Sequence, residues 1–268
     1  MRRYLTTPTR RAIHVAPVRA NVGLEFAYQR AIDTMIVRMH NAVARAIIAA
    51  YRRKPPEMAA DESPAAGLQD AINRLGREWE ARFDDFARSR GRTFGNAAAQ
   101  QTDKSFAAQL RKAGFTVQFQ ATKAWNDVKQ ATVHANVGLI RSIPVQHLDA
   151  IEGIVMRAVQ VGGDLHTIAS ALQAQFGVTK RRAAFIARDQ SSKATAAITR
   201  CRQTELGITE AIWMHSHGGK TPRPEHVAFN GKKYLIAKGA FLEGKWVWPG
   251  TEINCRCVCR SIIPEETR

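Results

Sequence analysis

Apolar residues recur every three or four positions through most of the chain before Gly207, the spacing that places side chains on one face of an α-helix. The first stripe predicts a long helix ending near Arg53, and consists of Ile32, Met35, Ile36, Met39, Val43 and Ile47. A second stripe consists of Leu68, Ile72, Leu75, Trp79, Phe83 and Phe86. The proline-containing stretch 54–67 between them is expected to be a linker.

The same spacing continues downstream, where local signals divide it into shorter helices. Pro144 favours a break, because proline disfavours the helical conformation at the residue before it. Gly177 is expected to stop one helix, and Thr179 to cap the next, which Gly207 would end. The helices expected from these signals cover 94–113, 121–143, 144–160, 164–177 and 179–207.

Beyond Gly207 the helical spacing disappears and short runs of β-forming residues appear between glycines and prolines. These runs are EAIWMHS, KKYLIA, KWVW and CRCVCRSII. The pattern therefore predicts an α+β fold, with an elongated helical N-terminal region followed by a C-terminal module of helices plus a small β-sheet. We divide the chain into an N-terminal arm, a helical domain and a C-terminal domain, over 1–20, 21–143 and 144–268.

The chain is strongly basic, with 40 Lys and Arg against 23 Asp and Glu and a net charge of +17. Such a balance favours a polyanionic partner, of which nucleic acid is the first candidate. The basic residues that we expect to contact DNA lie in the arm and on the last long helix: Arg2, Arg3, Arg10, Arg11, Lys180, Arg181 and Arg182. Two alternatives remain, an arm that is ordered on a partner protein and a helix that is solvated by its own charges.

Other classes of protein lack support in the sequence. No apolar run is long enough to span a membrane, and the first twenty residues lack the apolar middle of a signal peptide, so we expect a protein made in a cytoplasm without a membrane partner. No G-x-S-x-G, Walker, H-E-x-x-H or G-x-G-x-x-G pattern occurs. We therefore expect no enzymatic activity.

Three of the four cysteines stand at alternate positions, Cys255, Cys257 and Cys259. In a strand they would share one face, either as buried thiols or as part of a zinc site, which needs four ligands. The nearest further donors are His215, His217 and His226. The TPRPEH segment is expected to be a stiff loop that presents Arg223 and His226.

The C-terminal half resembles one family, the phage Mu F-like minor head proteins, also called phage head morphogenesis proteins. The resemblance covers roughly 145–264 and includes the TELGITEA helix end, an R-x-x-H…G segment, a PG turn and N-C-R-C. The motif residues in this chain are Arg223, His226, Gly231, Pro249, Gly250, Asn254, Cys255, Arg256 and Cys257.

The resemblance implies a minor capsid protein of a tailed bacteriophage, in low copy inside the head near the portal, which aids head assembly and DNA packaging or ejection. The implied partners are the portal protein, the major capsid protein and packaged double-stranded DNA, with self-association left open. The implied location is the virion interior, after assembly in the host cytoplasm. A non-specific DNA-binding protein and, third, a metal-dependent enzyme are the alternatives.

The resemblance also bears on the cysteines. Similar proteins of the family carry C-x-x-C where this chain has Arg223 and His226, which implies a mixed site of His226, Cys255 and Cys257 completed by His217 or Cys259. No cofactor is expected to be required, and Zn²⁺ is the metal that this donor set would take. The alternative is mechanical, with Asn254 as a turn residue and Arg256 bridging to an acid such as Glu225.

Overall fold

A computed structural model describes residues 12–53, 64–161, 165–219 and 221–264 of the chain. Its contacts divide the chain into two compact units. The helical unit comprises 22–95 and 131–190, and the mixed unit comprises 1–21, 96–130 and 191–268. Helices dominate, with a small antiparallel sheet near the C-terminus, so the predicted α+β class is confirmed. Over the described residues, no helix combines the length and the apolar character needed to cross a membrane.

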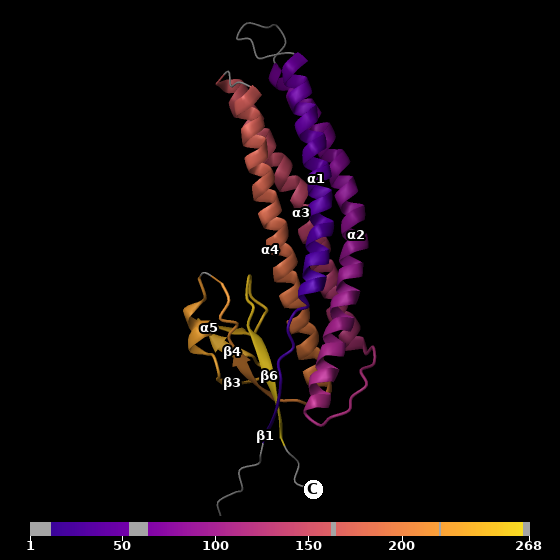
Figure 1. Ribbon diagram of the computed structural model, residues 1–268, viewed down its shortest axis with the longest axis vertical. Coiled ribbons are helices and arrows are strands. Elements are labelled where there is room, and N and C mark those ends of the chain that lie inside the picture. Colours follow the sequence, from indigo (N-terminus) through magenta and orange to yellow (C-terminus); the bar gives the residue numbers. More distant parts are fainter. Residues whose placement is uncertain (1–11, 54–63, 162–164, 220, 265–268) are drawn as a thin grey trace, which may run out of the picture. The chain divides into compact units, whose positions relative to one another are not determined.

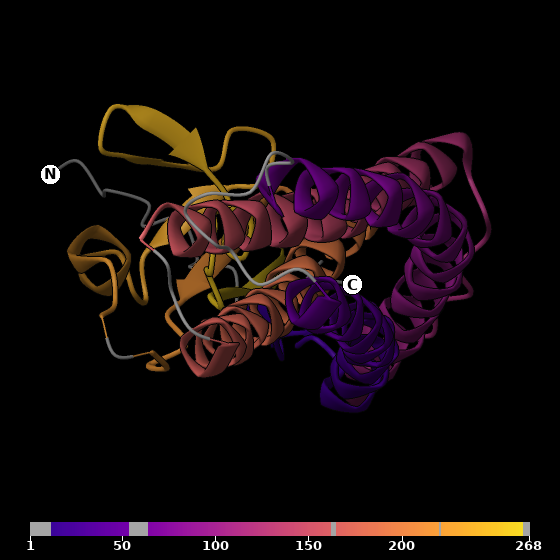
Figure 2. The same cartoon turned by 90° about the horizontal axis from the view of Figure 1, so that it is seen from above.

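Four long helices supply the helical unit, where they lie side by side (Figure 2). They are α1 (Val22–Arg53), α2 (Pro64–Lys112), α3 (Lys123–Gln160) and α4 (Leu165–Glu205), and the last three also contribute residues to the mixed unit. Five of the six residues in the predicted stripe of α1 are buried in the core, and Met35 is partly exposed. The five with no exposed surface are Ile32, Ile36, Met39, Val43 and Ile47. Burial of such aliphatic side chains, at about 1.5 to 3 kcal/mol each, drives the packing of these helices.

A buried polar network joins the four helices of this unit. The Tyr28 hydroxyl donates to Asn136 Oδ1 over 2.8 Å, and Asn136 Nδ2 donates to Gln190 Oε1 over 3.2 Å. The Tyr28 ring also stacks on Phe94, with ring centroids 4.3 Å apart. Because Asn136 is fully buried and its bonds are directional, the network fixes how α1, α2, α3 and α4 face one another within the unit.

The helices are longer than the sequence predicts. The stripe from Leu68 to Phe86 and the expected helix over 94–113 lie in one helix, α2, which ends at Lys112. The expected break at Pro144 lies inside α3. A proline in a helix interior costs about 3 kcal/mol. Ile140, Ile143, Leu148 and Ile151 nevertheless form one buried face that spans Pro144. Continuing the helix keeps all four in the core, which offsets the local cost.

The predicted division of α4 at 177–179 is also wrong, because Gly177 and Thr179 both lie inside this helix. The Thr179 hydroxyl donates to Gln175 O and lies 2.8 Å from His147 Nδ1 on α3, so it bridges two helices and caps neither. Gly207 does end the helix as predicted, with φ of 68° and a bond from Ile208 N to Gln203 O.

Two glycines of α2 allow close packing on α3. A Cβ atom at Gly91 would lie 2.9 Å from Val137 Cγ2, and one at Gly95 would lie 2.5 Å from Val133 Cγ2. Both distances are shorter than real contacts, so the helices approach each other through these positions. The glycines thus serve packing and do not interrupt the helix.

The mixed unit contains a four-stranded antiparallel sheet in the order β1-β6-β2-β3, and Figure 1 labels β1, β6 and β3. Its strands are β1 (Ala12–Val15), β2 (Glu210–Met214), β3 (Lys233–Leu235) and β6 (Val258–Pro264). A separate hairpin consists of β4 (Ala240–Leu242) and β5 (Lys245–Val247). The four predicted β runs thus contribute strands, although the last strand begins at Val258 and leaves Cys255 and Cys257 in the preceding loop.

The strand β1 is a feature that the sequence analysis did not predict. It pairs with β6, with Ala12 opposite Pro264 and Val15 opposite Ser261. Val15 is fully buried in the core of the mixed unit, which also takes Phe106 and Leu110 from α2. The compact units therefore differ from the division into 1–20, 21–143 and 144–268, because distant parts of the sequence share one core.

Arg202 of α4 is almost fully buried in the mixed unit and is bound by three residues. It forms two bonds to Asp103, of 2.9 and 2.7 Å, and its Nη1 reaches Glu205 Oε2 at 2.6 Å and Gln120 O at 2.8 Å. The guanidinium also lies over the rings of Phe119 and Trp125. The bidentate pair joins α4 to α2, and the separate bond to Gln120 O holds the loop before α3 on the end of α4.

Candidate metal centre

A one-turn helix, α5 (Pro224–Ala228), carries His226. The sequence analysis expected a stiff loop here, but Pro224 at the first helical position instead favours a turn of helix, since its missing N–H would have no partner there. His226 is buried, and its ring meets the Trp213 ring edge-on with centroids 4.9 Å apart. The imidazole of His226 therefore packs against Trp213, a core residue of the mixed unit.

The two cysteines reach His226 because the loop before β6 folds back on itself. Gly250 has φ of 82° and Asn254 has φ of 58°, the left-handed region that these residue types tolerate. A Cβ atom at Gly250 would lie 3.0 Å from Ala196 Cβ and 3.2 Å from Cys257 O, so only glycine fits against α4. The expected role of Asn254 as a turn residue agrees with this backbone.

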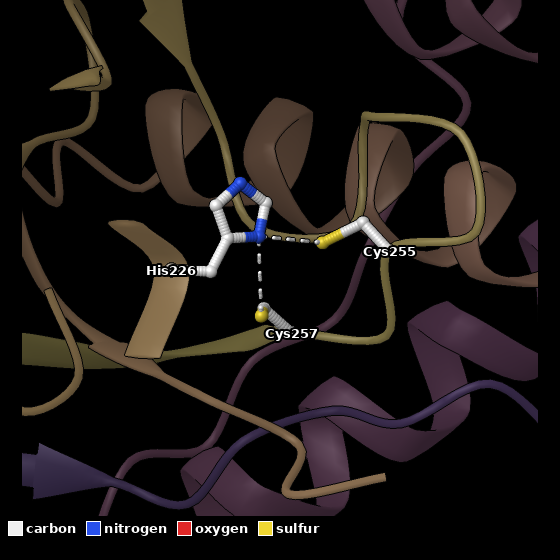
Figure 3. A group of neighbouring side chains, drawn as sticks. All are labelled: His226, Cys255 and Cys257. Carbon is white, nitrogen blue, oxygen red and sulfur yellow. Dashed lines mark hydrogen bonds between the residues drawn. The ribbon is translucent and has the colours of Figure 1, made fainter. Parts of the chain in front are cut away.

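His226, Cys255 and Cys257 converge on one point (Figure 3). His226 Nδ1 lies 3.6 Å from Cys255 Sγ and 3.7 Å from Cys257 Sγ, and all three residues are buried. Their donor atoms lie within 4.8 Å of one another. The structure thus brings together three of the four residues that the sequence analysis assigned to a metal.

The second ring nitrogen of His226 binds an acid that the sequence analysis did not single out. His226 Nε2 lies 2.8 Å from Glu252 Oε2, and Arg223 Nε lies 3.7 Å from the same oxygen. Lys245 forms an ion pair with the other oxygen. An ionised carboxylate only accepts, so Nε2 carries the proton and the lone pair of Nδ1 faces the sulfur atoms.

The electrostatics of this acid follow from its neighbours. Burial would raise the pKa of Glu252, but the hydrogen bond and charge of Lys245, with the charge of Arg223 and the bond to His226, lower that pKa below its ordinary value. Glu252 is therefore the acid that organises the loop. Among the described residues no ion pair joins Arg256 to Glu225. The expected bridge between these two residues is therefore wrong, and the acid that holds this loop is Glu252.

The two thiols differ in pKa because one donates a hydrogen bond to the other. The hydrogen bond from the Cys257 thiol, assisted by the backbone N–H groups of Cys257 and Gly250, lowers the pKa of Cys255 to about 6. The same bond, together with burial, raises the pKa of Cys257. Cys255 is consequently the sulfur that ionises first in the absence of other ligands.

An open cavity of about 450 Å³ lies next to this cluster. His226, Cys255 and Cys257 all line it, and Arg223 and Arg256 line it with basic side chains. The three residues are thus largely shielded from solvent and also line this cavity.

The other predicted residues lie around this group. His217 stays outside it, with φ of 53° and its ring against that of His215 at 4.9 Å. Cys259 also lies outside, where Gln203 Nε2 donates to its sulfur over 3.2 Å. Pro249 is buried beside Gly250, and Gly231 has φ of 78° and donates its N–H to Trp213 O.

The predicted DNA-contact residues fall into two sets. Arg2, Arg3, Arg10 and Arg11 lie outside the described residues. On α4, Arg181 is exposed, Lys180 lies over the Phe176 ring, and half-buried Arg182 donates to Ser142 Oγ over 2.9 Å. These three side chains therefore do not form one uniform exposed surface.

Comparison with known families identifies the region that contains this centre. The family described as Phage Mu protein F like protein matches residues 149–260, which include all nine motif residues. Residues 149–260 therefore belong to the phage Mu F-like family, as their resemblance indicated.

A relative from Haemophilus influenzae (strain ATCC 51907 / DSM 11121 / KW20 / Rd), described as an uncharacterized protein, is 36% identical over 128 residues. The alignment covers 48% of this chain and 28% of the relative. The chain thus matches less than a third of that protein's length. No solved structure matches the chain.

Proposed function

We propose that the chain is a minor capsid protein of a tailed bacteriophage, present in few copies inside the head near the portal. There it aids head assembly and the packaging or ejection of DNA. The observation that carries the proposal is the family match over 149–260, with its full set of motif residues. The portal protein, the major capsid protein and packaged double-stranded DNA are the proposed partners, and the virion interior is the proposed location.

The charge of the chain supports this location. A net charge of +17 suits a protein that lies among densely packed phosphates, since contacts with the DNA backbone need no base readout. Several motif residues, by contrast, make contacts within the protein: Gly250 and Asn254 bend a loop, and His226 secures that loop by its bond to Glu252, which is outside the motif. These residues therefore keep the C-terminal module rigid and are not proposed to contact DNA.

The test is quantitative mass spectrometry of purified phage particles, with the amount of this chain measured relative to the portal protein. The expected result is a low, fixed ratio, together with loss of infectious particles when the gene is deleted and recovery when it is supplied again. Absence of the chain from purified particles, or full infectivity without the gene, would contradict the proposal.

Non-specific DNA binding by the isolated protein is the second candidate, and the excess of 40 basic over 23 acidic residues favours it. It differs from the first candidate in one respect, because it requires no portal or capsid partner. Binding by the purified chain alone, with a steep dependence on salt concentration, is its distinguishing property.

A further inference from the structure

We propose that His226, Cys255 and Cys257 bind one Zn²⁺ ion through Nδ1 and the two sulfur atoms, with the fourth coordination position open to the adjacent cavity. The proposal concerns the folded module itself and does not depend on its role in a phage head. It also replaces His217, which the sequence analysis placed in the site, by a ligand from the cavity.

The distances between the donor atoms match a tetrahedral zinc site. With Zn–S bonds near 2.3 Å and Zn–N bonds near 2.05 Å, tetrahedral angles place each sulfur about 3.6 Å from the nitrogen. The separations from His226 Nδ1 are 3.6 Å to Cys255 and 3.7 Å to Cys257. Both nitrogen-to-sulfur separations therefore agree with three ligands of one metal ion.

The orientation of the imidazole is already that of a ligand. Glu252 accepts the bond from Nε2, which fixes the tautomer. Nδ1, whose lone pair is then free, faces the two sulfur atoms (Figure 3). A carboxylate behind a histidine is the usual outer partner of zinc-bound imidazole. Lys245 and Arg223 hold the carboxylate in turn, so it is committed to this role and does not need to become a ligand.

The charges also balance. Two thiolates and a neutral imidazole around Zn²⁺ give a group with no net charge, and such a group can be buried without the large penalty of an isolated ion. The backbone N–H of Gly250 donates to Cys255 Sγ over 3.4 Å, which supports a negatively charged sulfur. Both thiol protons leave to solvent when the metal binds.

The fourth position follows from the cavity. All three ligands line a space of about 450 Å³, so a bound ion would face it. Among the described residues no further His, Cys, Asp or Glu donor completes the group of His226, Cys255 and Cys257. A water molecule is therefore the fourth ligand, and Arg223 and Arg256 at the wall make the position favourable for small anions.

The experiment uses the purified full-length chain. Elemental analysis after dialysis is expected to give about one zinc per chain, and cobalt added to the metal-free protein is expected to give thiolate-to-metal charge transfer and the strong visible bands of four-coordinate cobalt. The variants C255S and C257S should lose both signals, while C259S and C201S should keep them. Metal-free wild-type protein that binds neither ion would overturn the proposal.

Two further measurements guard the result against misfolding. Glu252→Gln should retain cobalt but bind it roughly 10- to 100-fold more weakly. Azide should change the visible cobalt bands by displacing water, and bands that do not respond would overturn the open fourth position. If C255S and C257S fail to fold, the zinc content and cobalt spectrum of the wild-type chain still test whether the chain binds the metal. Equal loss of metal in folded C259S would contradict the assignment of ligands.

Discussion

His226 and Glu252 are joined by a 2.8 Å hydrogen bond that links α5 to the loop before β6. The two residues are 26 positions apart in the sequence, and the bond is mostly shielded from solvent because Glu252 is only 14% exposed and His226 only 3%. Since a buried bond to a charged group is stronger than a neutral one, this contact holds the loop in place.

Replacing Glu252 by glutamine should lower the free energy of unfolding by about 1.5 to 3 kcal/mol at neutral pH, because the charge that attracts Lys245 and His226 is lost. Chemical denaturation monitored by tryptophan fluorescence measures this. Glu243→Gln is the matched control, since Glu243 is exposed at the turn between β4 and β5. Equal stability of the two variants would contradict the role of Glu252.

The same residue predicts a dependence on pH. The folded pKa of Glu252 is below its ordinary value of 4.5, so its contribution to stability is complete above 4.5 and is lost as pH falls through the folded pKa. Unfolding measured at a series of pH values should show a decline in this acid range that is smaller in Glu252→Gln. An identical decline in the wild-type chain and the variant would rule out this source.

Gly250→Ala should destabilise the chain more than Gly244→Ala. Both positions have positive φ, 82° and 77°, so each alanine carries a backbone cost of about 1 to 2 kcal/mol. Only at Gly250 would the new Cβ also meet Ala196 and Cys257, while nothing lies within 4 Å at Gly244. Thermal unfolding of the two variants isolates the steric part, and a larger loss at Gly244 would be inconsistent with the packing described.

Asn136→Ala should lower the free energy of unfolding by about 1 to 3 kcal/mol for each buried group left without a partner. Tyr28 would lose its acceptor and Gln190 its donor. Asn73→Ala on the exposed surface of α2 is the control, with an expected change within about 0.5 kcal/mol. Denaturant titration compares them, and a neutral effect at Asn136 would show that the network adds nothing to stability.

Neutralising Arg2, Arg3, Arg10 and Arg11 tests the DNA-binding candidate. If all four contact phosphates, the slope of the logarithm of affinity against the logarithm of salt concentration should fall by about 3 to 4. Fluorescence anisotropy with duplexes of unrelated sequence measures this slope. A charge-matched control neutralises exposed lysines elsewhere: Lys104, Lys123, Lys233 and Lys238. The same change in both variants would mean that only net charge matters.

The sequence predicted the buried stripes of the helices better than their ends. Periodicity identified Ile32 and its partners on α1 because burial depends on spacing alone. Pro144 and Gly177 misled the analysis, since a local preference of a few kcal/mol yields to a continuous buried face that only the fold reveals. The strand β1 was missed because four residues carry too short a pattern, and its partner lies near the other end of the sequence.

The candidate metal centre was also predicted only in part, because some of its contacts depend on the fold. The family resemblance implied His226, Cys255 and Cys257 as ligands, and the structure brings them together. Glu252 was missed, although the sequence places an acid between the PG turn and N-C-R-C. Its role depends on the turn at Asn254 and on the distant α5, so spacing could not distinguish it from any surface acid, nor exclude His217.

The pairing of β1 with β6 shows that the segment matched by the family is shorter than the unit that folds together. The family match ends at residue 260, within β6, and excludes β1, whose pairing shields one edge of that strand. A gene exchange limited to the matched segment would deliver a β6 with unsatisfied backbone groups, which would have to pair with the first strand of the recipient protein or with another chain. Successful exchange of the matched segment between proteins therefore requires compatible N-terminal residues as well.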